Sequence, residues 1–132
     1  TSRAWLQRWL VETSTGDKRL RAGVQGWKVG DMVYTSGQLG VDMETGKLAE
    51  GVEAQARASM RNVGEILKAA GASYGDVVKT TIFVKDLADF KTVNTVYAEF
   101  FDGVYPARSC VQVAALPMGG LVEIEAVAMV EA

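Results

Sequence analysis

The chain has 132 residues, of which 48% are hydrophobic and 23% are charged, with a formal net charge of −2. This balance is typical of one soluble globular domain over 1–132, gives no electrostatic footprint for nucleic acid and includes no apolar run long enough to span a membrane. The absence of histidine and the single cysteine exclude Ser-His-Asp and Cys-His catalysis, the usual zinc sites and an internal disulfide. A lone thiol and the lack of a recognisable signal peptide lead us to expect a cytoplasmic protein.

The first 24 residues allow two interpretations. Trp5 and Trp9 recur with leucines at helix-like spacing, which would give one apolar stripe. The alternative is a hairpin whose strands cover 9–12 and 19–25, and the Ser-Thr-Gly-Asp turn between them favours it slightly. In either case we expect the tryptophans to pack on the body of the protein or on a partner.

From Trp27 onwards, apolar periodicity alternates between strand and helix patterns. Two helices are enough to cover one face of a sheet, so the order predicts an α+β fold in which both helices pack on one face of a mixed β-sheet. The other face keeps apolar residues, which predicts an oligomer. In chain order we expect a turn at 28–31, a strand over 32–35, a turn at 42–46, a helix over 52–70, a strand over 77–85, a helix over 90–101, a buried central strand over 110–116, a turn at 118–120 and a last strand over 121–130.

One charged residue stands at the start of the expected central strand. Arg108 follows Pro106, and burying a guanidinium without a partner is costly. It therefore needs an anion. This anion is either a protein carboxylate in a structural salt bridge, which is the more common case, or a ligand carboxylate whose two oxygens the guanidinium binds at once. Cys110 is interpreted as a small core residue rather than a nucleophile, because no histidine exists to activate it.

The last strand carries two carboxylates on one face. Val122 and Ile124 should face the core, whereas Glu123 and Glu125 point the other way, about 7 Å apart. Either both pair with lysines across the sheet, or one of them faces a pocket and handles a water molecule.

Several segments together resemble the Rid (YjgF) family. The resemblance covers 25–132 with the family's spacings, and the combination is specific although each short motif alone is weak. The segments that carry it are Tyr34-Thr35-Ser36-Gly37-Gln38, Lys79-Thr80-Thr81-Ile82-Phe83-Val84, Thr92-Val93-Asn94, Pro106-Ala107-Arg108-Ser109 and Glu123-Ile124-Glu125-Ala126-Val127-Ala128.

The resemblance implies a chorismate-mutase-like fold and a homotrimer with a cleft at each subunit interface. It also implies an enamine/imine deaminase that hydrolyses reactive 2-imino acids to 2-keto acids and ammonia without a metal or cofactor. By this resemblance Arg108 binds the substrate carboxylate and Glu123 positions or activates water. The cleft lining would include Ser36, Gly37, Asn94 and the backbone near Cys110. An imine is already electrophilic, so orientation, an anchor and one proton-handling carboxylate suffice.

The chain also departs from the family pattern. The family's Gly-Pro-Tyr reads Arg21-Ala22-Gly23 here, so the tyrosine that closes the cleft is missing, which would weaken the activity. Met118 replaces a lysine, and the segment with Trp5 and Trp9 does not align. One hypothesis is a scaffold engineered at its N-terminal edge for further protein–protein assembly or for an opened ligand-binding pocket. The other is a divergent natural member.

Overall fold

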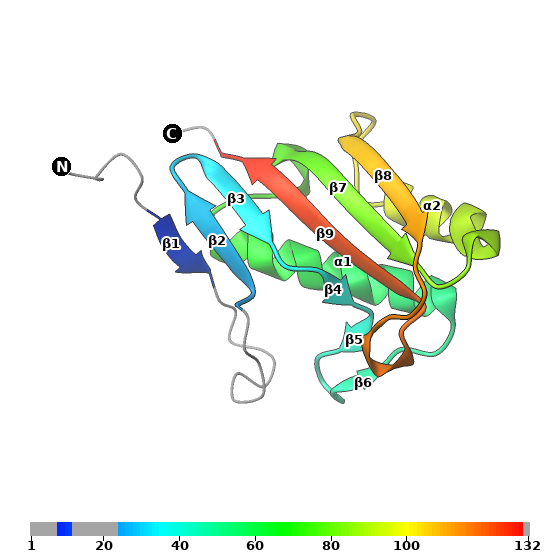
Figure 1. Ribbon diagram of the computed structural model, residues 1–132. Coiled ribbons are helices and arrows are strands. Elements are labelled where there is room, and N and C mark those ends of the chain that lie inside the picture. Colours follow the sequence, from blue (N-terminus) through cyan, green and yellow to red (C-terminus); the bar gives the residue numbers. More distant parts are fainter. Residues whose placement is uncertain (1–7, 12–23, 131–132) are drawn as a thin grey trace.

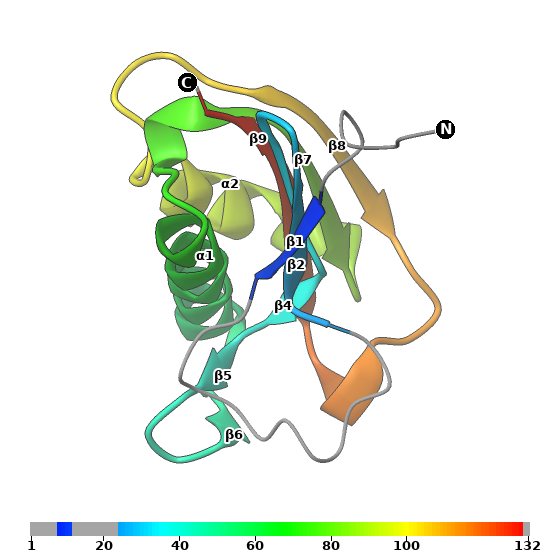
Figure 2. The same cartoon turned by 90° about the vertical axis from the view of Figure 1, so that its left-hand side faces the viewer.

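The computed structural model describes residues 8–11 and 24–130. They form two layers, in which both helices lie on one face of a mixed sheet (Figures 1 and 2). The strand order is β1-β2-β3-β9-β7-β8, with β4 also pairing with β9 and with β5 and β6 forming a separate hairpin. The elements are β1 (Arg8–Val11), β2 (Gly26–Val29), β3 (Met32–Thr35), β4 (Gln38–Leu39), β5 (Val41–Asp42), β6 (Lys47–Leu48), α1 (Val52–Ala69), β7 (Val77–Val84), α2 (Phe90–Ala98), β8 (Ala107–Gln112) and β9 (Val122–Met129).

The core lies between the helices and the sheet, as the periodicity predicts. Met60 and Leu67 of α1 are fully buried against the sheet, together with Ile82 of β7. In β9 the expected alternation is confirmed, because Val122 and Ile124 have no exposed surface whereas the intervening positions are half-buried. This alternation fixes which face of β9 each carboxylate occupies.

The segment after Arg108 corrects one expectation. It was predicted to be a buried central strand over 110–116, but β8 covers Ala107–Gln112 and lies at the edge of the sheet, where most of its residues are exposed in the single chain. The chain crosses from β7 through α2 to β8, which pairs in parallel with β7 alone, and β9 takes the central place between β3 and β7. An apolar run does not distinguish a central strand from an edge strand that another subunit covers.

The N-terminal segment resolves partly in favour of the hairpin. Residues Arg8–Val11 form a strand, so the helix interpretation is wrong there. The strand partner is Gly26–Val29, not the predicted 19–25, and the turn predicted at 28–31 is confined to Gly30 and Asp31. Trp5 and the Ser-Thr-Gly-Asp turn lie outside the described residues.

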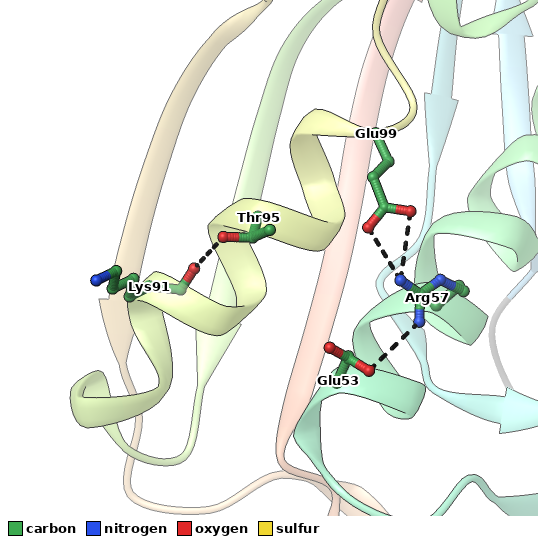
Figure 3. Close-up of polar contacts among 5 residues, drawn as sticks. All are labelled: Glu53, Arg57, Lys91, Thr95 and Glu99. Carbon is green, nitrogen blue, oxygen red and sulfur yellow. Dashed lines mark hydrogen bonds and ion pairs between the residues drawn. The ribbon is translucent and has the colours of Figure 1, made fainter.

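An ion pair ties the two helices together (Figure 3). The guanidinium of Arg57 in α1 donates to Glu99, just after α2, at 2.9 Å and lies 3.8 Å from Glu53 in its own helix. Within α2, the hydroxyl of Thr95 donates to the carbonyl of Lys91 at 3.0 Å. The Arg57–Glu99 pair holds the end of α2 against α1. Across the described part of the chain, neither helix has the length and apolar character needed to cross a membrane.

Candidate functional site

Arg108 stands at the start of β8, on the side of the sheet that faces α2. One guanidinium nitrogen donates to the Asn94 side-chain oxygen. The guanidinium carbon lies 5.1 Å from the ring centre of Phe90 and 5.4 Å from that of Tyr97. All three partners come from α2 and none carries a negative charge.

The structural salt bridge considered for Arg108 is absent among the residues that the structure describes, where the ion pairs are those of Arg57. The positive charge of Arg108 is therefore not neutralised by a described carboxylate. An arginine in this state can still grip an incoming carboxylate through its remaining N–H groups.

A pocket of about 550 Å³ opens beside this arginine. Its lining residues are Asn94, Tyr97, Ala98, Tyr105, Pro106 and Arg108. A larger depression of about 640 Å³ lies between the β5–β6 hairpin and α1 and contains none of the predicted site residues. The smaller pocket therefore combines the space and the charge that a small carboxylate needs.

Cys110 lies two residues further along β8, on the same side as Arg108. Its side chain packs against the hydrophobic core. Desolvation by burial raises the pKa of the thiol, and the positive charge of Arg108 opposes this effect. A protonated, half-buried thiol agrees with the interpretation of Cys110 as a packing residue rather than a nucleophile.

A second group of predicted residues gathers where β4 pairs with the start of β9. The backbone of Glu123 is paired with Leu39, and its carboxylate lies over Gly37, where an added Cβ would be 2.8 Å from it. Ser36 is exposed beside them, and its hydroxyl accepts a hydrogen bond of 3.0 Å from the side chain of Gln38. Glycine at 37 thus makes room for the Glu123 side chain.

The electrostatics of Glu123 differ from those of an ordinary surface carboxylate. Desolvation raises its pKa above the usual value, and the negative charge of Glu125 on the same face raises it further. Lys79, which lines a depression together with Glu125, donates to the Ser109 hydroxyl at 2.8 Å. Pairing of these carboxylates with lysines across the sheet is not found among the described residues.

Arg108 and Glu123 lie on opposite faces of the sheet within one chain. Arg108 is in register with Thr80 of β7, which is buried on the helix-covered face. Glu123 is in register with Phe83, which lies on the face of the sheet without helices because it alternates with the buried Ile82 and Val84. Paired residues in a sheet project to the same side. A single chain therefore does not bring the two predicted catalytic residues together.

Three aromatic residues around Arg108 were not predicted as site residues. Phe90 and Tyr97 are seven positions apart, which is two helical turns, and this spacing also marks a core-facing helix stripe. Tyr105 lies before the strand and lines the pocket. The sequence holds no signal that separates these rings from ordinary core residues, because their contact with a cation is visible only in the folded chain.

Comparison with known proteins gives one consistent result. Residues 20–130 match the family model described as endoribonuclease L-PSP. The chain is 57% identical over 122 residues, or 90% of its length and 95% of the relative's, to a 2-iminobutanoate/2-iminopropanoate deaminase of Salmonella typhimurium. It is 48% identical to the putative reactive intermediate deaminase TdcF of Escherichia coli, over 91% of this chain and 95% of the relative. The crystal structure of E. coli TdcF with bound serine superposes with a TM-score of 0.88 at 47% identity, covering 93% of this chain and 99% of that one.

Proposed function

This chain belongs to the endoribonuclease L-PSP family, which is the Rid (YjgF) family expected from its sequence, and we propose that it is an enamine/imine deaminase. The reaction is hydrolysis of a reactive 2-imino acid to a 2-keto acid and ammonia. The observation that carries the proposal is Arg108, a cation beside a pocket with no described carboxylate to neutralise it. The high identity to a named 2-iminobutanoate/2-iminopropanoate deaminase supports it.

In the proposed mechanism, Arg108 grips the substrate carboxylate and so fixes the imine carbon next to it. Glu123 accepts a proton from a water molecule as the water oxygen bonds to that carbon. The imine nitrogen takes up protons and leaves as ammonia when the C–N bond breaks and the keto C=O bond forms. A pKa raised by burial suits Glu123 to both accepting and returning a proton.

We further propose a homotrimer with clefts between subunits. Arg108 and Glu123 face opposite sides of the sheet, so a complete site needs contributions from two copies. The face without helices also carries a row formed by Leu10, Trp27, Tyr34 and Val127, which are in register across four strands, and Tyr34 is 44% exposed. Covering this row removes apolar surface from water. Ser36, Gly37, Asn94 and the backbone near Cys110 then line the cleft.

The test is release of 2-keto acid from 2-iminobutanoate generated in the assay. We expect the purified protein to exceed the spontaneous rate and Arg108→Ala to lose kcat/KM by roughly 30-fold to 5,000-fold, the range for truncating one partner of a desolvated charge pair. Arg61→Ala is the matched control, because Arg61 is an exposed arginine of α1 that lines other depressions and not the pocket beside Arg108. An unchanged spontaneous rate with the wild-type protein would refute the deaminase.

A second candidate is an assembly or small-carboxylate-binding scaffold without turnover. It is favoured by Met118, which is 61% exposed and lies outside the apolar row of the proposed trimer interface. Native mass measurement separates the possibilities: a trimer fits the deaminase, and a larger multiple of three that Met118→Ser converts to trimers fits the assembly. A monomer would remove the intersubunit cleft altogether. For either candidate we propose a cytoplasmic location, because the lone thiol suits a reducing compartment.

A further inference from the structure

Within the described part of one chain, the Arg108 guanidinium contacts only uncharged groups. The rings of Phe90 and Tyr97 lie under it, and Asn94 accepts one of its N–H groups. Surface arginines usually sit beside a carboxylate or in water. Here a ring face attracts the cation through its quadrupole without cancelling its charge, so the field of the arginine remains directed at whatever enters the pocket.

The two rings are fixed from behind. The Tyr97 hydroxyl shares a buried hydrogen bond of 2.7 Å with Thr80 in β7, and its ring packs on Phe101 at 4.9 Å between centres. Phe90 begins α2, which is tied to α1 through the ion pair of Arg57 (Figure 3). The guanidinium therefore rests on a surface that the core and the helix pair hold in place.

We propose that Phe90 and Tyr97 are positioning residues that hold the arginine anchor as an unneutralised cation and thereby make the site select a carboxylate over an uncharged group. This inference rests on the proposed function, because it takes Arg108 as the anchor for the substrate. It adds that anchoring strength is set by the aromatic face of α2, and that the rings act on ligand binding rather than on the chemical step.

A packing role alone makes a different prediction. If the rings only fill the core, their loss should weaken every ligand equally through a looser fold. If they position the cation, their loss should weaken a carboxylic acid and leave its uncharged amide unaffected. The ratio of the two affinities is therefore the diagnostic quantity.

The experiment compares Phe90→Leu with Phe100→Leu. Phe100 is a matched control because it is a phenylalanine just after α2 whose ring packs on Tyr74, with 5.3 Å between ring centres, and not on Arg108. Calorimetry with 2-ketobutyrate and 2-ketobutyramide gives the affinities, and the imine assay gives KM and kcat. We expect Phe90→Leu to weaken the acid about tenfold, to leave the amide unchanged and to raise KM more than it lowers kcat. Phe100→Leu should leave the ratio at the wild-type value, and Phe90→Trp should restore it.

Equal losses for acid and amide, an unchanged acid affinity in Phe90→Leu, or the same ratio change in Phe100→Leu would overturn the inference. Failure of the proposed function looks different. In that case the wild-type protein does not accelerate imine hydrolysis, while binding of 2-ketobutyrate still depends on Arg108 and Phe90. If the wild-type protein neither hydrolyses the imine nor binds the acid, both are overturned.

Discussion

Gly37 lies directly against the carboxylate of Glu123, so that a Cβ on Gly37 would stand 2.8 Å from both the carboxyl carbon and one of its oxygens. The contact arises because β4 follows immediately and pairs with β9 at Leu39 and Glu123. The orientation of the proposed proton-handling group thus depends on the absence of a side chain at one position.

Gly37→Ala is therefore expected to displace the Glu123 side chain and to lower kcat about tenfold, because proton transfer depends on the placement of the carboxylate. The clash is with the far end of a flexible side chain, so thermal stability should change little. Gly75→Ala is the control, since its new Cβ meets only the Ser73 hydroxyl at 3.7 Å. An alanine variant with wild-type kcat would show that this contact does not orient the proposed proton-handling carboxylate.

The raised pKa of Glu123 predicts a pH effect with a defined sign. The folded protein binds the proton of the Glu123 carboxyl group more tightly than the unfolded chain does. The contribution of Glu123 to stability therefore falls as the pH rises from the ordinary pKa of a glutamate through the raised pKa of Glu123 in the folded protein. Glu125→Gln removes the like charge, which should lower the pKa of Glu123 and shift the acidic limb of kcat/KM to lower pH. Rate profiles over about pH 4 to 8 test this; a limb that stays in place would mean that Glu125 does not act on the group that titrates.

Gly64→Ala should destabilise the protein although it lies inside a helix, where alanine normally gains about 1 kcal/mol over glycine. The new Cβ would stand 2.0 Å from the hydroxyl oxygen of Tyr74, which donates to the carbonyl of Met60 at 2.6 Å. Burial raises the pKa of Tyr74 to about 12, so this hydroxyl stays a donor. We expect a net loss of roughly 1–3 kcal/mol in chemical denaturation, and a smaller loss in a Tyr74→Phe background. Stabilisation by Gly64→Ala would contradict the packing described.

Met118→Gly should stabilise the turn before β9. Met118 has φ 60° and ψ 13°, a left-handed conformation that costs a residue with a side chain about 1–2 kcal/mol. Part of the gain is lost to the greater freedom of glycine in the unfolded chain, so we expect about 0.5–1 kcal/mol net. Met118→Ala keeps the strain and should bring no such gain in a thermal unfolding experiment.

The helices and the last strand could be predicted from sequence because each buries one face. α1 runs over Val52–Ala69 against the expected 52–70, and β9 over Val122–Met129 against 121–130. Periodicity reports which residues meet the core, and these elements follow that signal closely. α2 ends at Ala98, three residues before the expected end at 101, since aromatic residues continue the apolar pattern beyond the helix.

The place of β8 and the surroundings of Arg108 could not be read in the same way. Whether a strand lies at the centre or the edge of a sheet depends on which strands pair. The last strand, β9, pairs with β3 and β7, which are distant from it in the sequence, and this pairing leaves β8 at the edge. The contacts of Arg108 with Phe90 and Tyr97 join a strand to a helix that precedes it by some ten to twenty positions. A hydrophobic pattern assigns such rings to the core and gives no hint that they also support a cation.

The placement of Arg108 and Glu123 on opposite faces has a genetic consequence. If each cleft takes its arginine from one subunit and its glutamate from the neighbour, two inactive alleles, Arg108→Ala and Glu123→Gln, can complement one another in mixed trimers. Random association of equal amounts leaves about one cleft in four with both residues intact, because each cleft draws two independent subunits. Two alleles that both lack the arginine, or both lack the glutamate, would then fail to complement each other. One allele of each kind would partly restore activity.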